Sequence, residues 1–185
     1  RRPPRSTIFP YTTLFRSWRI EMEKTARTVE VREFPPMNVA YIRHIGPYKG
    51  NSQLFENLFE RLCKWAYPRN LVNHAETRFL IVYHDNPDIT ADEKLRISVC
   101  LTVAEDTPVE GEIGKMSIAG GKYAVCRFEL KTNEFEEAWN WLYGSWLPDS
   151  GYITDDRMCF EIYPIQNEAQ KNHFTVDICI PVKPL

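Results

Sequence analysis

The sequence V-A-Y-I-R at residues 39–43 returns in altered form as Y-A-V-C-R at residues 123–127, 84 positions later. Two more pairs follow in the same order: F-L-I-V-Y at 79–83 with C-F-E-I-Y at 159–163, and I-S-V-C-L at 97–101 with V-D-I-C-I at 176–180. Similarity repeated in a fixed order indicates a duplicated unit whose copies bury a face together. Residues 37–182 are therefore predicted to be one structural unit written twice.

Each copy reads as strand, helix, strand, strand. The strands alternate apolar and polar residues, and the helices repeat apolar residues at three- and four-residue steps. The predicted class is α+β, with pseudo-twofold duplicated modules forming two antiparallel sheets around a central groove. The predicted elements are a leading strand Val29–Phe34; then Asn38–Ile45, a helix from Asn51 closed by Pro68, Arg78–His84 and Arg96–Val103; then, after a polar connector Pro108–Lys115, Lys122–Leu130, a helix Phe135–Leu147 ended by Pro148, Met158–Tyr163 and His173–Val182.

Composition narrows the class of protein. The chain of 185 residues is 43% hydrophobic and has a net charge of −2, so it can bury a core and lacks the basic surplus typical of a nucleic-acid binder. No stretch is long and apolar enough to predict a membrane span. The five cysteines have neither zinc-site nor disulfide-framework spacing, which is typical of a reducing cytoplasm. We expect a cytoplasmic protein.

The first seventeen residues, RRPPRSTIFPYTTLFRS, have a composition unlike the rest of the chain. From Thr7 to Ser17 they closely resemble the conceptual translation of a common sequencing adapter, with Ile8 in place of Leu. We expect residues 1–17 to be non-native and poorly packed, residues 18–28 to be a linker, and residues 29–185 to be the domain.

Glu161 is the most informative difference between the two copies, because its counterpart in the first copy is Ile81. Side chains alternate across a strand, so Glu161 and Tyr163 are expected to face the cleft, and Phe160 and Ile162 the helix. A carboxylate between apolar neighbours must find a partner or undergo a rise in pKa. Three readings stay open: a solvated or arginine-paired glutamate, an anionic anchor for a cationic ligand, and a catalytic carboxylate.

Several aromatic residues are candidates for the walls of that cleft. Tyr83 is the first-copy partner of Tyr163, whereas Trp139 shares the apolar helix stripe and is expected in the core. For Trp141, Trp146 and Tyr41, packing and ligand contact are weighed equally. The four histidines have no metal-ligand spacing, and we expect neither a metal nor another cofactor.

A family resemblance rests on several motifs together. They are F-P-P-M-N-V-A-Y-I-R-H-I-G-P-Y at 34–48, D-N-P-D-I-T at 85–90, G-G-K-Y-A-V at 120–125, W-L-Y-G-S-W-L-P-D-S-G-Y at 141–152, C-F-E-I-Y at 159–163 and V-D-I-C-I-P-V at 176–182. Over about Val29 to Lys183 the chain resembles the GyrI-like small-molecule-binding domain, the effector-binding domain of AraC-type regulators such as Rob, which also occurs alone. Two departures are Pro164, where Leu is common, and Ser98, where the family often has Asp.

The resemblance implies a central groove with an acidic residue for cationic or amphipathic compounds. Glu161 matches that position, and the aromatic walls would come from Tyr83, Tyr163 and Trp141 or Trp146. Phe160 would join them only if the strand-face assignment is off by one residue.

Three functions follow from this resemblance. The first is a ligand-binding sensor domain of a bacterial transcription regulator, with no nucleic-acid contact by this fragment because residues 18–28 are too few for a two-helix DNA reader. The second is a hydrolase of reactive cyclopropane-type compounds that uses Glu161. The third is a stand-alone gyrase-modulating protein. The expected partner is a small molecule rather than a membrane, and a homodimer is considered.

Overall fold

The structure is a computed structural model that describes residues 28–73, 76–164 and 173–185. The adapter-like segment 1–17, and the predicted linker apart from Thr28, lie outside the described residues. Within the described ranges, no helix is both long and apolar enough to cross a membrane.

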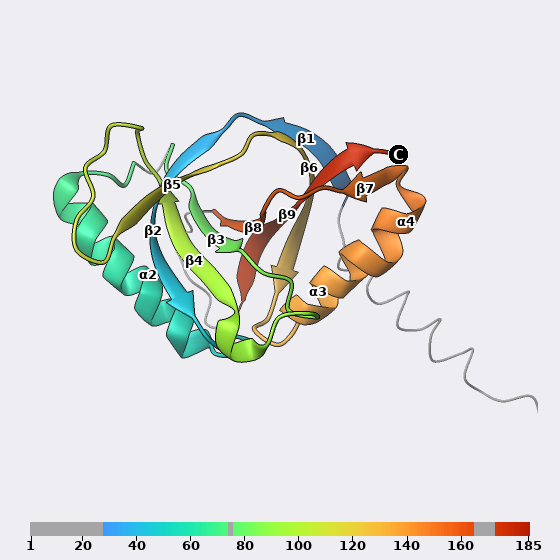
Figure 1. Ribbon diagram of the computed structural model, residues 1–185, viewed down its shortest axis with the longest axis horizontal. Coiled ribbons are helices and arrows are strands. Elements are labelled where there is room, and N and C mark those ends of the chain that lie inside the picture. Colours follow the sequence, from blue (N-terminus) through green and yellow to red (C-terminus); the bar gives the residue numbers. More distant parts are fainter. Residues whose placement is uncertain (1–27, 74–75, 165–172) are drawn as a thin grey trace, which may run out of the picture.

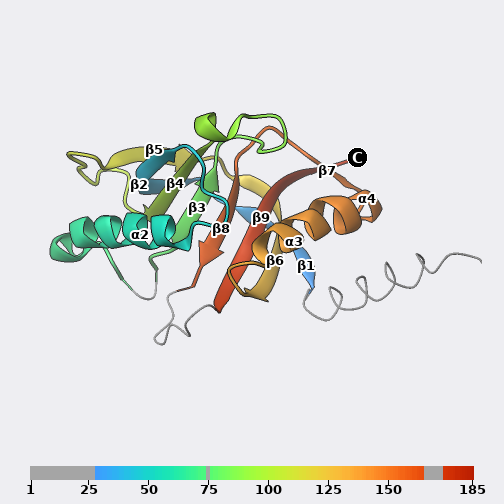
Figure 2. The same ribbon diagram turned by 90° about the horizontal axis from the view of Figure 1, so that it is seen from below.

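The described part of the chain forms one antiparallel sheet with helices on one side (Figures 1 and 2). The strand order is β1-β6-β9-β8-β3-β4-β2-β5, and the short β7 pairs with β9. The strands are β1 (Val29–Phe34), β2 (Met37–Ile45), β3 (Phe79–Tyr83), β4 (Arg96–Thr102), β5 (Gly114–Ile118), β6 (Gly121–Leu130), β7 (Tyr152–Thr154), β8 (Cys159–Tyr163) and β9 (Phe174–Pro184).

The strand order contains the duplication. The first copy contributes β2, β4 and β3, and the second contributes β6, β9 and β8 in mirrored order, so the two copies meet where β3 pairs with β8. At this seam Ile81 lies directly opposite Glu161. The α+β class and the duplicated modules are thus confirmed. The two predicted sheets are joined edge to edge by backbone hydrogen bonds.

Each copy covers its strands with one helix on the same side of the sheet (Figure 2). Helix α2 (Ser52–Ala66) begins at Asn51, whose side chain accepts a hydrogen bond from the backbone N–H of Leu54 at 3.1 Å, and it buries Leu58 and Leu62. Helix α3 (Phe135–Trp141) packs against β6 and β9 instead. Since each helix covers one end of the sheet, the seam strands β3 and β8 lie between them.

The second helix continues past its predicted end. A π-helical turn at Leu142–Trp146 follows α3, and α4 (Leu147–Asp149) follows that turn. Pro148 therefore lies in the first turn of α4, where its missing N–H costs little, and does not end the helical run. Strands β5 and β7 were not predicted, because β5 overlaps the polar connector and β7 has only three residues.

Both faces of the sheet are covered. On the helix side, Ile81, Val99 and Leu101 pack with the apolar face of α2. On the other side, Phe160 packs against Tyr123 with ring centroids 4.9 Å apart and against Phe34 of β1 at 6.0 Å. The central strands are therefore buried on two faces, which is why apolar residues occupy both alternating sets.

Candidate functional site

Glu161 lies in the middle of β8, at the seam between the two copies. Its side chain points to the side of the sheet that carries α2 and α3, and only 1% of the residue is exposed. A buried carboxylate requires hydrogen-bond donors, because it has lost its water shell. The donors come from β8 itself, from β3 and from α3.

Three side chains donate hydrogen bonds to the carboxylate: Trp139, Tyr163 and Tyr83. The indole N–H of Trp139 donates to Oε1 at 2.7 Å, and the hydroxyl of Tyr163 donates to Oε2 at 2.7 Å. All three donors are neutral, and within the described residues no Lys or Arg forms an ion pair with Glu161. In the described part of the chain, the negative charge of Glu161 is therefore stabilised by hydrogen-bond donors and not by a cation.

Aromatic rings from both copies surround this carboxylate. Tyr83 lies with its ring centroid 5.4 Å from that of Trp139 and 5.8 Å from that of Tyr48. Phe59 of α2 packs edge-on against Tyr163 at 6.1 Å. We call Glu161 with Tyr48, Tyr83, Trp139 and Tyr163 the Glu161 cluster.

Burial dominates the acid–base properties of the cluster. It raises the pKa of Glu161, while hydrogen bonds from Tyr163, Trp139 and Tyr83 oppose the rise. Burial and the nearby Glu161 charge raise the pKa values of Tyr83 and Tyr163 well above normal, and they raise the pKa of Tyr48 to about 12. The tyrosines stay protonated at neutral pH and can donate hydrogen bonds.

The structure brings together three of the seven residues predicted from the sequence: Glu161, Tyr163 and Tyr83. The other four lie away from the cluster. Trp141 packs edge-on against Phe128, with the centroids 6.2 Å apart; Trp146 packs with the hydrophobic cluster of Ala124, Ile180 and Val182; Phe160 is buried on the opposite face; and Tyr41 lies under the guanidinium of Arg43.

The predicted strand faces are wrong in one respect. Phe160 and Ile162 were expected to face the helices, whereas they pack on the side of β1 and β6, and Glu161 and Tyr163 face the helices. The error arose from assuming that apolar residues mark the helix side. Because both faces of β8 are covered, alternation separates the two sets but does not say which one meets a helix.

Two members of the cluster were missed. Trp139 was expected in the core; it does pack there, and it also donates to Glu161. Tyr48 follows the Gly46-Pro47 turn at the end of β2, and only its family motif drew attention to it. A polar N–H on an otherwise apolar helix stripe was the available signal for Trp139, since a buried indole usually finds an acceptor.

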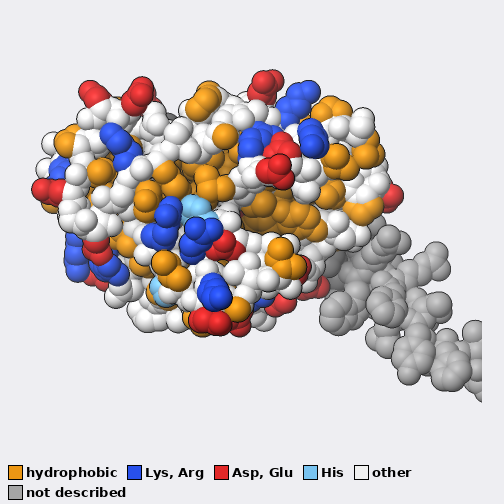
Figure 3. Space-filling model, in the orientation of Figure 1, with side chains coloured by type: hydrophobic (Ala, Val, Ile, Leu, Met, Phe, Trp, Pro, Cys, Tyr) orange, Lys and Arg blue, Asp and Glu red, His pale blue; other side chains and the backbone are white. Residues whose placement is uncertain are grey.

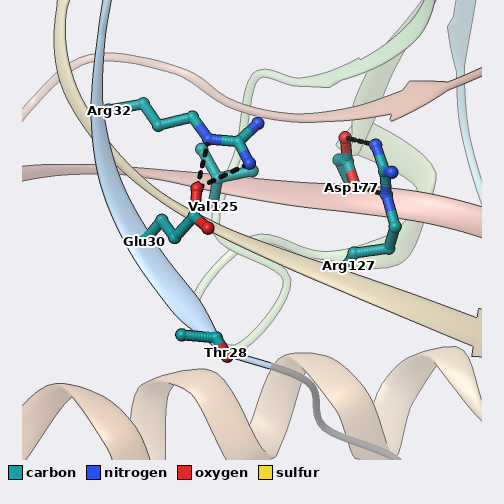
Figure 4. A pocket seen from close by; sticks show the side chains of 6 residues that line it. All are labelled: Thr28, Glu30, Arg32, Val125, Arg127 and Asp177. Carbon is teal, nitrogen blue, oxygen red and sulfur yellow. Dashed lines mark hydrogen bonds and ion pairs between the residues drawn. The ribbon is translucent and has the colours of Figure 1, made fainter.

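Two hollows lie on the other face of the sheet, beside β1. Their volumes are about 220 and 260 Å³, and they share Arg32, Arg127 and Asp177. Figure 4 shows the first hollow, in which Arg32 pairs with Glu30 and Arg127 with Asp177. Both hollows are smaller than typical small-molecule pockets, so the Glu161 cluster remains the candidate site.

The described residues contain no group of three or more His, Cys, Asp or Glu side chains placed to hold a metal ion. All five cysteines are free thiols. The functional groups available at the Glu161 cluster are therefore a carboxylate, phenol and indole hydrogen-bond donors, and the faces of aromatic rings.

Known proteins resemble this chain in sequence and in fold. The profile of the GyrI-like small molecule binding domain matches residues 27–183. A protein of Citrobacter rodentium (strain ICC168) named DNA gyrase inhibitor is 30% identical over 159 residues, which cover 84% of this chain and 97% of that protein.

Solved structures with little sequence identity have the same fold. The EcmrR C-terminal domain superposes with a TM-score of 0.67 at 20% identity, covering 85% of this chain and 98% of that one. SAV2435 bound to tetraphenylphosphonium has a TM-score of 0.56 at 12% identity, covering 85% and 94%. The profile match extends over nearly all of the described residues, and so this chain belongs to the family of GyrI-like small molecule binding domains.

Proposed function

We propose that this domain binds a lipophilic cation at the Glu161 cluster and acts as a cytoplasmic sensor of such compounds. One observation carries the proposal: Glu161 is buried with aromatic rings around it and no cationic side chain among the described residues pairs with it. A buried carboxylate without a counter-charge costs free energy. A cationic ligand would supply that charge.

The rings suit the rest of such a ligand. Faces of Tyr and Trp attract cations and also offer apolar surface to aromatic or alkyl substituents. In this structure the rings of Tyr83 and Trp139 pack together at 5.4 Å and close over the carboxylate. Binding is therefore expected to displace ring side chains, which would couple ligand entry to a shift of α3 through Trp139.

Similarity to solved structures supports the proposal by analogy. SAV2435 was solved with tetraphenylphosphonium, a lipophilic cation, and shares the fold. Ligand binding is the first step both for the effector domain of a regulator and for a stand-alone binding protein. A sensor role is therefore compatible with either kind of protein.

Titration with tetraphenylphosphonium, followed by tryptophan fluorescence, tests the proposal. Saturable binding is expected for the wild type, with a loss of about tenfold or more in affinity for Glu161→Gln, which keeps the shape and removes the charge. Tetraphenylborate is the control ligand, because it has a similar shape and the opposite charge. Equal binding of the two ions, or unchanged affinity in Glu161→Gln, would reject the proposal.

A second candidate is a stand-alone modulator of DNA gyrase. It is favoured by the end-to-end match to a protein named DNA gyrase inhibitor, of which the alignment covers 97%. A supercoiling assay with purified gyrase and relaxed plasmid tests it, with and without tetraphenylphosphonium. Inhibition that Glu161→Gln leaves unchanged would show a gyrase surface separate from the cluster, and no inhibition at a large molar excess would remove this candidate.

A further inference from the structure

The duplication places an arginine at the same position in both copies. Arg43 on β2 lies opposite Ser98 on β4, and Arg127 on β6 lies opposite Asp177 on β9. Both arginines lie on the face of the sheet away from the helices. The two pairs are structural equivalents with different chemistry.

In the second copy the arginine is neutralised within the fold. Arg127 forms a two-pronged pair with Asp177, from Nε to Oδ1 at 2.7 Å and from Nη2 to Oδ2 at 2.8 Å. The Asp177 side chain is only 9% exposed, so the pair is held rigidly at the sheet surface. This geometry is the usual match of a guanidinium to a carboxylate.

In the first copy the carboxylate is replaced by a hydroxyl. Arg43 Nε donates to Oγ of the fully buried Ser98 at 3.3 Å, and the same oxygen lies 2.8 Å from Nε2 of His84. Within the described ranges, no acidic side chain forms an ion pair with Arg43. Its other contacts are the sulfur of Met116 at 3.8 Å and the ring face of Tyr41 at 4.6 Å.

The neighbourhood of Arg43 keeps a surplus of positive charge. Arg96 is matched by Asp85 at 2.7 Å, and His84 is neutral at pH 7 because burial, Arg43 and Arg96 lower its pKa to about 4. That leaves the charge of Arg43 unbalanced at this position. Figure 3 shows Lys or Arg side chains and a histidine near the middle of one face, with an Asp or Glu side chain next to them.

We infer that Arg43, together with Ser98 and His84, forms a second ligand site that binds the oxyanion of a small molecule, a carboxylate or a phosphate. Ser98 and Met116 take up Nε and one N–H of Nη2, so the end of the guanidinium formed by Nη1 and Nη2 is the part that can bind two acceptor oxygens. The hydrogen bond to Ser98 orients the guanidinium of Arg43, and the guanidinium also stacks on the ring of Tyr41. The site is separate from the Glu161 cluster, which lies on the opposite face and would take a cation.

Exchanging the two copies' partners tests the inference. Ser98→Asp gives Arg43 the same internal partner that Arg127 has, so binding of inorganic phosphate or acetate should weaken about tenfold or more. Asp177→Ser should do the reverse and create a second site at Arg127. Calorimetry gives the stoichiometry, and the Nε–H signal of Arg43 in NMR spectra reports its occupancy.

Further measurements identify the preferred anion and test the site with a second variant. Titrating phosphate and acetate in parallel identifies which oxyanion class the site prefers. Arg43→Gln, a change at an exposed residue, replaces Ser98→Asp if that variant fails to fold, and it should weaken binding at least as much. Binding that persists in both variants, or no saturable binding of either anion to the wild type, would overturn the inference. Tetraphenylphosphonium affinity should be unchanged in Ser98→Asp, so failure here is distinguishable from failure of the proposed function.

Discussion

The indole N–H of Trp139 donates to a carboxylate oxygen of Glu161 at 2.7 Å, and this bond ties helix α3 of the second copy to the seam between the copies. Trp139 is one of three neutral donors to this buried carboxylate, with Tyr163 and Tyr83. The bond makes the helix position and the state of the carboxylate interdependent.

Replacing Trp139 with Phe should cost about 2 kcal/mol of unfolding free energy, because it leaves one oxygen of a buried carboxylate without its donor. Urea denaturation at pH 7 measures the loss. Trp141→Phe is the matched control, since Trp141 packs against Phe128 and is not a donor to Glu161 in this structure. Equal losses in the two variants would argue that ring size, not the hydrogen bond, sets the cost.

Glu161→Gln should raise the unfolding free energy at pH 7 by about 1–3 kcal/mol, because it removes a buried charge that has no cation partner among the described residues. The pKa of Glu161 is raised in the fold, so its folded form holds protons that the unfolded chain releases. Its contribution to stability is therefore present below the ordinary carboxyl pKa and lost as pH rises through the folded value. Unfolding curves from pH 4 to 8 should be flatter for the variant.

Glu60→Gln serves as the control for that series. Glu60 is a surface residue paired with Lys64, and that hydrogen bond lowers its pKa. Its pH effect has the opposite sign and is screened by solvent. A wild-type pH slope that Glu161→Gln leaves in place would assign the slope to another group.

His84 should titrate in the folded protein near pH 4. Burial is the main cause of the lowered pKa, followed by the charges of Arg43 and Arg96, while Asp85 acts in the opposite direction. The unfolded chain takes up this proton near pH 6.5, so stability from His84 is complete above that value and is lost as pH falls toward 4. NMR titration of the ring protons measures the pKa directly, and Arg43→Gln should move it upward.

Arg157 should be the most costly arginine to lose. Its guanidinium donates to the carbonyl oxygens of Gly120 at 3.0 Å, Lys122 at 2.8 Å and Val182 at 3.3 Å, and it pairs with Asp155. Arg157→Lys cannot reach all of these acceptors, so we expect a loss of about 2–4 kcal/mol in unfolding free energy.

Arg32→Lys is the comparison for Arg157, because the Arg32 pair with Glu30 is exposed and should contribute less than 1 kcal/mol. Thermal unfolding of both variants gives the contrast. A similar small loss in both would mean that the carbonyl contacts of Arg157 add nothing.

The periodicity of the sequence was sufficient to predict the duplicated strands and helices. It did not predict which face of the sheet the helices cover. The apolar strands and the stripe of α2 repeat at spacings that only one secondary structure satisfies, so these elements could be located. Strand β5 was missed because Lys115 and Ser117 point outward from a strand that also contains Gly114, a composition typical of loops.

Only the strand residues of the Glu161 cluster could be predicted from the sequence. Glu161, Tyr163 and Tyr83 share strand parity, so their common face followed from alternation. Trp139 and Tyr48 arrive from a helix and a turn, and only the path of the chain in space brings them to the carboxylate. Trp141 and Trp146 lie on the same helical run, but Trp141 packs against Phe128, and Trp146 packs with Ala124, Ile180 and Val182.

The pairing of Ile81 with Glu161 across the seam has a consequence for the history of the chain. Two identical chains meeting at this axis would place the same residue on both sides, and two buried carboxylates roughly 5 Å apart cannot both ionise. Covalent joining of the copies is what allows one side to keep a glutamate and the other an isoleucine. The seam therefore buries one carboxylate charge and not two, and one monovalent cation would neutralise that charge completely.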